Sequence, residues 1–278
     1  MSLWATMKQH KLIQVGIPLL ALFVLSFFVL STVFPQASVE PNVDHYVYQY
    51  IAQHILDGQI PYRDLWDHKG ILIYLIYALG LIIDPNYGLW ILSYLVLALT
   101  STGFYALLQQ VFKDKAGSFL TTIVVLWYLA KLLEGGNSVE FFNLPLQLLS
   151  FYVIWYWVKT KRQVFIFLLG AAAGLSFLLR PNEAFLAFAF GLFLLFFKRE
   201  TFAKNLLILT LGGIVALAPF LLWLYQNQAL YDFYDIVWRF NILYSISSGA
   251  TFANRAAVLL TGFEKLSLFF VIALATYI

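Results

Sequence analysis

The stretch LIQVGIPLLALFVLSFFVLSTVF, residues 12–34, decides the fold class of this chain. A helix needs about 20 apolar residues to cross the hydrocarbon core of a bilayer, within a range of roughly 17–25. This run is long enough and carries no charged residue. It exceeds the apolar core of a secretory signal peptide, about 7–15 residues, and the FPQAS at its end is a poor cleavage site. We therefore expect an uncleaved transmembrane anchor rather than a signal peptide.

The composition of the whole chain also indicates a membrane protein. Of its 278 residues, 62% are hydrophobic and 11% are charged, whereas soluble domains average about 45–50% apolar and 25% charged residues. A net charge of +3 is too small to indicate nucleic acid as a partner. Because the chain has no cysteine, disulfides, thiolate metal sites and cysteine nucleophiles are excluded.

Further apolar runs predict an all-α fold, a polytopic bundle of transmembrane helices that forms one domain over residues 1–278. The other expected spans are residues 87–109, 117–133, 141–158, 164–179, 184–197, 205–225 and 266–278. Pro181 ends the preceding helix, so 164–197 is expected to form a helical hairpin. The GAAAG at 170–174 is typical of close helix packing. The chain ends inside an apolar run, which indicates a fragment of a longer protein.

Three segments are predicted to be interfacial helices that lie along the membrane surface. Residues 71–83 are short for a span, and residues 231–246 are amphipathic and rich in aromatics. Residues 43–57 form the third, with a turn at Gly58–Pro61 that ends the helix. In that helix the i, i+4, i+7, i+8 spacing predicts one apolar face, with Asp44 and Tyr48 on other faces. The expected face comprises Val43, Val47, Tyr50, Ile51, His54 and Ile55.

The distribution of basic residues predicts the orientation of the chain in the plasma membrane. With a cytoplasmic N-terminus, most lysines and arginines fall in short cytoplasmic segments, as the positive-inside rule requires. These residues are Lys8, Lys11, Lys113, Lys115, Lys159, Lys161, Arg162, Lys198, Arg199 and Lys204. Most aspartates and glutamates then lie outside the cell.

The first outer loop contains many of the ionisable residues of the chain. Its sequence, at residues 43–70, is VDHYVYQYIAQHILDGQIPYRDLWDHKG. Asp44 falls in the first turn of its helix, where the helix dipole favours a carboxylate. It could be only a first-turn acid, but Asp67, His68 and Lys69 follow at the far end of the same loop. The outer ends of later spans add further charged candidates, which are Glu140, Arg180 and Arg239.

This loop resembles that of a known enzyme family. The pattern D-x-x-x-Y-x-x-x-A-x-x-(I/L)-L-x-G-x-x-P-Y-x-D-x-W-D-H-K, followed by an apolar helix, is similar to the outer loop of GT-C membrane glycosyltransferases. The similarity is to glycosyltransferase family 39 and its bacterial relatives, which include protein O-mannosyltransferases and the aminoarabinose transferase of lipid A. The matching residues are Asp44, Tyr48, Ala52, Ile55, Leu56, Gly58, Pro61, Tyr62, Asp64, Trp66, Asp67, His68 and Lys69. GGNSVEFFNLP, residues 135–145, also matches, whereas Gly70 and Ile71 stand where many relatives have two prolines.

The resemblance implies transfer of a sugar from a polyprenyl-phosphate donor to an acceptor at the outer leaflet. An acceptor hydroxyl needs a general base, for which Asp44 is the candidate. The leaving phosphate needs cationic stabilisation. The candidates are Lys69 first, then Arg180 and Arg239. Tyr48 and Asn137 are weaker candidates for binding the sugar or the acceptor.

A divalent cation such as Mg or Mn is a further expectation, since carboxylates suit hard cations. Its candidate ligands are Asp67, His68 and Glu140. Each charged candidate also has a structural alternative, because Lys69 could snorkel from an interfacial helix and Glu140 could be a first-turn acid.

Two other classes of protein remain open from the residues. One is a transporter or flippase of lipid-linked sugars, although such proteins usually bury ionisable residues near the middle of the membrane. The other is a non-enzymatic envelope assembly subunit, which would leave the Asp44–Lys69 cluster unexplained. The expected partners are membrane lipid, the lipid-linked donor and an acceptor that is a glycan, a protein or a lipid. The sequence does not identify the sugar.

Overall fold

The computed structural model describes residues 3–31, 43–132 and 137–247. Every named element in these ranges is a helix, which confirms the all-α fold class. The expected span at 266–278 lies outside the described residues.

The long helices overlap the apolar runs expected to span the membrane, although α1 begins at Leu3, well before residue 12. They are α1 (Leu3–Ser31), α4 (Gly88–Phe112), α5 (Lys115–Leu132), α6 (Val139–Thr160), α7 (Gln163–Leu179), α8 (Phe185–Phe197) and α9 (Phe202–Gln226), with short 3-10 turns η1 (Pro181–Ala184) and η2 (Arg199–Thr201) on either side of α8. Of the helices that the structure describes, three are long and apolar enough to cross a bilayer by length and composition. They are Gly88–Phe112, Val139–Thr160 and Arg199–Gln226. The chain is an integral membrane protein.

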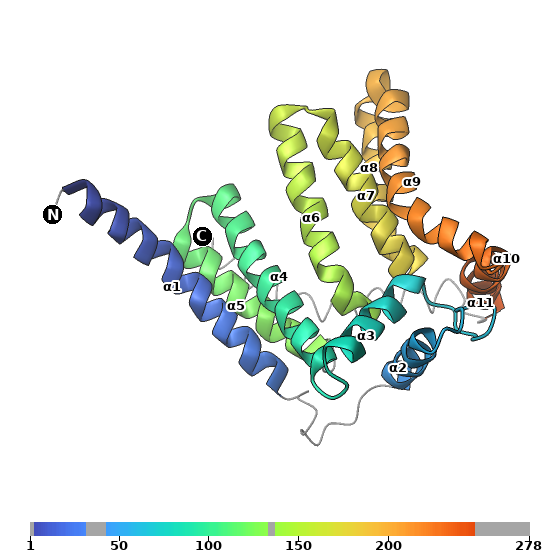
Figure 1. Cartoon of the computed structure of the whole chain (residues 1–278). Coiled ribbons are helices and arrows are strands. Elements are labelled where there is room, and N and C mark those ends of the chain that lie inside the picture. The colour runs from blue at the N-terminus through green and yellow to red at the C-terminus, as the bar shows by residue number, and fades with distance from the viewer. Residues whose placement is uncertain (1–2, 32–42, 133–136, 248–278) are drawn as a thin grey trace.

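The long helices form two groups in Figure 1, with α1, α4 and α5 in one and α6 to α9 in the other. Contacts between α4 and α6 join the two groups. The closest packing is between α7 and α9, where small residues allow the backbones to touch. A Cβ on Gly170 would overlap the carbonyl of Leu209, and a Cβ on Gly212 would overlap that of Phe167. The packing predicted for residues 170–174 is confirmed.

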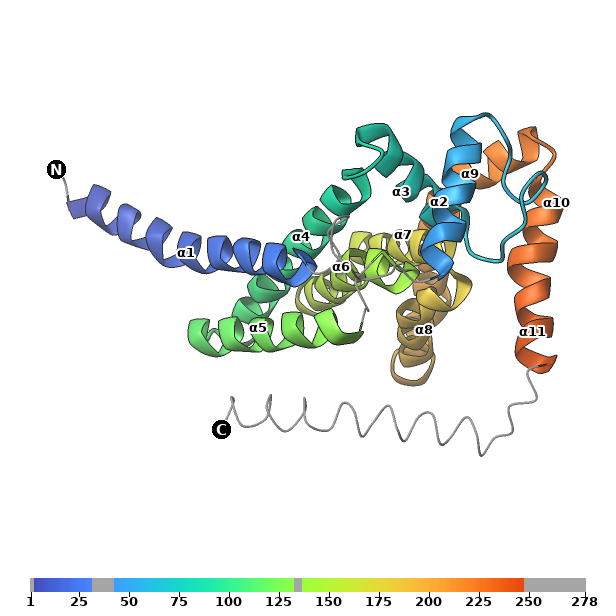
Figure 2. The same cartoon turned by 90° about the horizontal axis from the view of Figure 1, so that it is seen from below.

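Shorter helices gather at one end of this bundle. They are α2 (Val43–Leu56), α3 (Ile71–Ile83), α10 (Leu230–Phe233), the π-helix η3 (Tyr234–Phe240) and α11 (Asn241–Ser247). Figures 1 and 2 show α2, α3 and α10 at this end from two directions. The α2 and α3 helices match their predicted ranges to within one residue. The helix predicted at 231–246 instead has a π-helical centre, a form that is often found at functional sites.

The apolar face predicted for α2 is partly wrong. Val43 and Tyr50 are 74% and 57% exposed, whereas Tyr48, which was expected on another face, is 2% exposed. The Tyr48 ring packs against Tyr74 and Tyr77 of α3, with ring centroids 6.1 and 5.4 Å apart. A buried tyrosine needs a partner for its hydroxyl, and Tyr48 finds one in the Asp44 carboxylate.

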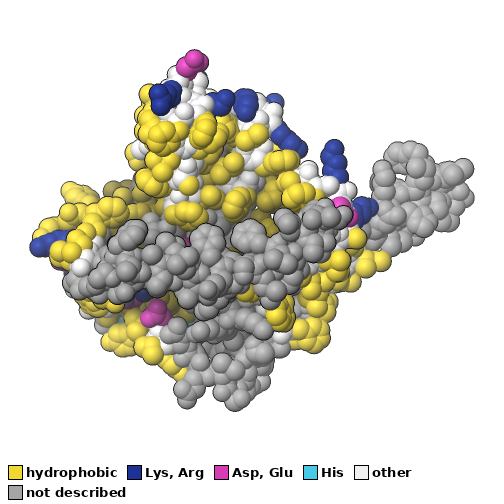
Figure 3. Space-filling model, turned by 180° about the vertical axis from the view of Figure 1, so that it is seen from behind, with side chains coloured by type: hydrophobic (Ala, Val, Ile, Leu, Met, Phe, Trp, Pro, Cys, Tyr) yellow, Lys and Arg dark blue, Asp and Glu magenta, His cyan; other side chains and the backbone are white. Residues whose placement is uncertain are grey.

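The opposite end of the bundle is basic. The connections α4–α5, α6–α7 and α8–α9 all lie toward the end away from α2 and α3 (Figure 1). Figure 3 shows lysine and arginine side chains at this end and hydrophobic side chains over the flanks of the helices. The exposed cations in these connections are Lys113, Lys115, Lys159, Lys161, Arg162, Lys198 and Arg199.

Candidate active site

A tight loop brings the two ends of the first outer segment together. Gly58, with φ +89°, allows the chain to turn after α2. The Asp64 carboxylate then accepts the Ile60 backbone N–H at 2.8 Å, and the Tyr62 backbone N–H donates to Leu65 at 2.8 Å. The turn predicted at Gly58–Pro61 is present, and the loop that follows it returns Lys69 to the start of α2.

Asp44 and Lys69 meet at the centre of the site. The Lys69 Nζ lies 3.6 Å from the Asp44 Oδ2, which also accepts the Tyr48 hydroxyl at 3.1 Å. The Lys69 side chain is 11% exposed and that of Asp44 is 55% exposed. Burial and the Asp44 charge raise the pKa of Tyr48 far above its ordinary value, so this phenol stays protonated and donates.

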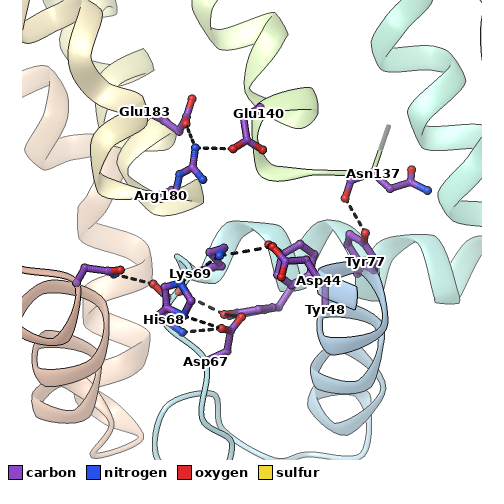
Figure 4. Close-up of polar contacts among 12 residues, drawn as sticks. Asp44, Tyr48, Asp67, His68, Lys69, Tyr77, Asn137, Glu140, Arg180 and Glu183 are labelled. Atoms are coloured by element: carbon purple, nitrogen blue, oxygen red, sulfur yellow. Dashed lines mark hydrogen bonds and ion pairs between the residues drawn. The ribbon is translucent and has the colours of Figure 1, made fainter. Parts of the chain in front are cut away.

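Asp67 and His68 continue this cluster away from Asp44 (Figure 4). Asp67 Oδ1 accepts the His68 backbone N–H and Oδ2 accepts the Tyr74 hydroxyl, both at 2.8 Å. Burial alone would raise the pKa of the Asp67 carboxyl, but the hydrogen bonds from His68 and Tyr74 outweigh it and hold that pKa below its usual value. The Lys69 backbone carbonyl accepts the Tyr62 hydroxyl at 3.0 Å, which fixes this end of the loop.

A second cluster surrounds Arg180 at the end of α7. The Arg180 Nη2 pairs with Glu140 at 2.6 Å and with Glu183 at 2.5 Å. Burial lowers the pKa of Arg180, but the contacts with both glutamates outweigh it and raise that pKa. Asn143 donates to Glu183 at 2.7 Å and accepts the Ser176 hydroxyl at 2.7 Å. This network ties the start of α6 to the α7–α8 turn.

Backbone contact places the two clusters side by side. The Gly70 N–H donates to the Leu179 carbonyl at 2.9 Å, so Lys69 and Arg180 lie on adjacent segments of the backbone. A Cβ on Gly70 would overlap the carbonyl of Leu178. Because glycine has no Cβ, the Gly70 backbone can approach Leu178 more closely than any other residue would allow.

The remaining candidates lie apart from these contacts or are engaged elsewhere. Asn137 accepts Tyr77 on its carbonyl at 2.7 Å, and its side-chain oxygen accepts the Ser93 hydroxyl. Arg239 pairs with Asp235 at 2.8 Å on its own helical turn, and its side chain is 60% exposed. The structure thus brings together Asp44, Tyr48, Asp67, His68 and Lys69, with Glu140 and Arg180 beside them, but not Arg239.

The candidate metal ligands do not form one group. Asp67 contacts His68, whereas Glu140 contacts Arg180. Among the described residues, no group of three or more histidine, aspartate or glutamate side chains could hold a metal ion. The geometry does not fit a divalent cation shared by Asp67, His68 and Glu140.

Several residues of the site were not singled out in the sequence. Glu183 lies three residues after Arg180, which is the ion-pair spacing of a helical turn and was the available signal. Tyr62 belonged to the matched pattern but was given no role, and Tyr74 gave no signal, because the roles of both depend on folding of the loop. Asn241, whose side chain donates to the His68 carbonyl at 2.9 Å, is 173 positions away in sequence.

The fold and the site together define a polytopic membrane protein with an acid–lysine centre at the end of its bundle opposite the basic connections. The chain matches the family model described as dolichyl-phosphate-mannose-protein mannosyltransferase over residues 68–225, which is more than half of its 278 residues. It belongs to that family and is a membrane glycosyltransferase that uses a lipid-phosphate sugar donor. The matched range includes Lys69, Glu140 and Arg180, and Asp44 lies before it. No curated protein and no solved structure matches the chain.

Proposed function

We propose that this protein transfers a sugar from a polyprenyl-phosphate donor to an acceptor hydroxyl at the α2–α3 end of the bundle, with Asp44 as general base. The observation that carries this proposal is the 3.6 Å approach of Lys69 Nζ to Asp44 Oδ2. This contact supports the proposal because it brings a proton acceptor and a cation that can bind phosphate into one site. The family supplies the donor class.

The reaction needs one proton acceptor and one anion partner. Asp44 takes the proton of the acceptor hydroxyl while the hydroxyl oxygen attacks the anomeric carbon of the donor sugar. The bond from that carbon to the phosphate oxygen breaks, and the electron pair leaves with the polyprenyl phosphate. Lys69 stabilises the negative charge that develops there. A single base with no covalent nucleophile inverts the configuration at the anomeric carbon.

Compensation of charge supports Lys69 over Arg180 as the principal phosphate ligand. Two glutamates already neutralise Arg180, whereas Lys69 faces the single carboxylate of Asp44. Arg180 serves as a secondary cation beside the phosphate. Arg239, which is exposed and paired with Asp235, is assigned no part in the reaction.

The separation of charge along the bundle supports an outer-face site. Basic connections mark one end, and the Asp44 cluster lies at the other. The positive-inside rule then assigns the basic end and the N-terminus to the cytoplasm. The site faces the outer side of the plasma membrane, where lipid-linked sugars meet envelope acceptors.

The base assignment is tested by Asp44→Asn in membranes that carry the full-length protein. Removing a general base lowers a rate by about 10²–10⁴-fold, so transfer from radiolabelled dolichyl-phosphate mannose should fall at least about a hundredfold. Asp57→Asn is the matched control, because Asp57 follows the same helix and is exposed. Full activity of Asp44→Asn would defeat the base assignment, and no transfer by the wild type would defeat the proposed donor chemistry.

The orientation is tested by single cysteines, since the chain has none of its own. Gln59→Cys, in the loop after α2, should react with an impermeant thiol reagent applied to intact cells. Lys161→Cys, between α6 and α7, should react only after permeabilisation. Labelling of both positions from the same side would contradict the proposed topology.

A further inference from the structure

Four side chains form a continuous series of polar contacts through the site (Figure 4). His68 Nδ1 lies 3.2 Å from Asp67 Oδ1, and His68 Nε2 lies 3.1 Å from Lys69 Nζ. Lys69 Nζ in turn lies 3.6 Å from Asp44 Oδ2. The imidazole therefore stands between a buried carboxylate and the cation that faces the proposed base.

With Lys69 in its ammonium form, one arrangement of protons satisfies every contact in this series. The ammonium of Lys69 has N–H donors and no acceptor, so His68 Nε2 must accept with its lone pair. A neutral imidazole then carries its proton on Nδ1, which donates to Asp67 Oδ1. The opposite tautomer would direct an N–H at the ammonium and leave the Asp67 contact without a donor.

The protein holds Asp67 and His68 firmly in this geometry. Asp67 is 8% exposed, and its second oxygen accepts the Tyr74 hydroxyl at 2.8 Å. The His68 carbonyl accepts the Asn241 side chain at 2.9 Å, and the His68 ring lies 5.8 Å from that of Phe240. Contacts from α3 and from the α10–α11 segment thus fix Asp67 and His68, which form a hydrogen-bonded relay to Lys69.

We propose that Asp67 and His68 are positioning residues for Lys69. Asp67 selects the tautomer of His68, and His68 Nε2 holds one N–H of Lys69, so that the ammonium stays beside Asp44 with a further N–H directed to the donor phosphate. This inference rests on the phosphate-binding role proposed for Lys69. It also differs from metal binding, because a metal on Nε2 would have to displace Lys69 from that lone pair.

Two amide substitutions at His68 separate the halves of the relay. The Gln oxygen of His68→Gln reaches the position of Nε2 and can still accept from Lys69. The shorter amide of His68→Asn reaches the position of Nδ1, so it keeps Asp67 and loses Lys69. The side chain of His68 is 30% exposed, and neither amide adds bulk or charge.

The measurement is the dissociation constant of dolichyl phosphate for the full-length protein in lipid nanodiscs, with thermal unfolding of each variant as a check on folding. Loss of a hydrogen bond that orders a charged group changes an equilibrium by about tenfold. His68→Asn should therefore weaken binding about tenfold, whereas His68→Gln should stay within about threefold of the wild type. Equal binding by the two variants, whether strong or weak, would overturn the relay.

A double-mutant cycle distinguishes failure of the relay from failure of the proposed function. Lys69→Met should weaken dolichyl phosphate binding, whereas Lys204→Met, an exposed change at the basic end, should not. In the Lys69→Met background, His68→Asn should have no further effect, because its partner is gone. Unchanged binding by Lys69→Met would refute the phosphate role itself. A full effect of His68→Asn in that background would refute only the relay.

Discussion

The Lys69 and Arg180 clusters lie side by side and differ in how completely each cation is neutralised. Lys69 faces one carboxylate, Asp44, at 3.6 Å. Arg180 contacts two, Glu140 and Glu183, at 2.6 and 2.5 Å. A cation with one distant carboxylate can bind another anion, whereas the charge of one with two close carboxylates is already neutralised. This difference supports the phosphate-binding role proposed for Lys69 and a mainly structural role for Arg180.

The two clusters connect the elements around them in a similar way. The Arg180 network joins three elements, because Glu140 begins α6, Arg180 follows α7 and Glu183 lies in η1. The Lys69 cluster likewise joins α2 to the loop before α3, and Asn241 of α11 donates to the His68 carbonyl of that loop. The clusters therefore differ in charge compensation rather than in exposure, since the side chain of Glu140 is 48% exposed and that of Asp44 is 55% exposed.

Replacing each cation by methionine should give the largest difference between the two clusters. Removal of a preorganised donor to developing charge costs about 10²–10³ in rate, so Lys69→Met should lower transfer about a hundredfold at unchanged thermal stability. Arg180→Met leaves Glu140 and Glu183 facing each other without a cation. It should lower stability by about 1–3 kcal/mol, with a loss of transfer below about tenfold.

Both variants are measured by sugar transfer and by thermal unfolding in the same detergent, with Lys204→Met as the control for loss of a cation. The comparison fails if Arg180→Met unfolds like the wild type yet loses as much transfer as Lys69→Met. In that event Arg180 would be a principal phosphate ligand despite its two glutamates.

The junction between the clusters should be sensitive to a single methyl group. Gly70 has φ −73° and ψ 159°, a backbone conformation that alanine adopts without strain, so the cost of Gly70→Ala is its overlap with Leu178. Overpacking typically costs about 1–3 kcal/mol. Gly191→Ala is the matched control, since nothing lies within 4 Å of a Cβ there. Equal melting temperatures for the two variants would show that the backbone around Gly70 shifts to accommodate the methyl group at little cost in stability.

The sequence predicted the helices well and the contacts between them less well. The α3 range agrees because Gly70 precedes its apolar run and Asp84 and Pro85 follow it. These are local signals. The face of α2 was predicted less accurately, because its aromatic residues can be buried on either side and the choice depends on α3. Tyr48 is buried since α3 offers two tyrosine rings and Asp44 accepts its hydroxyl.

The site shows the same division between local and long-range information. The turn at Gly58–Pro61, which allows Asp44 and Lys69 to approach each other, was predicted from local sequence, but the contact itself was not. The pairing of Glu140 with Arg180 and the π-helical segment η3 depend on contacts between distant elements. In particular, Asn241 contacts both Val237 in η3 and the His68 carbonyl. No periodicity in residues 231–246 encodes that contact.

The smallest effect is expected at Arg239, which tests where the phosphate site ends. Its partner Asp235 lies one turn away on an exposed surface, and pairs of this kind contribute about 0.3–0.5 kcal/mol. Arg239→Met should therefore leave stability and transfer close to those of the wild type, within about twofold for the rate. If this variant instead loses dolichyl phosphate binding as Lys69→Met does, the phosphate site extends over the α10–α11 segment. Arg239 would then be a third phosphate-binding cation, although no contact among the described residues joins it to the Lys69 or the Arg180 cluster.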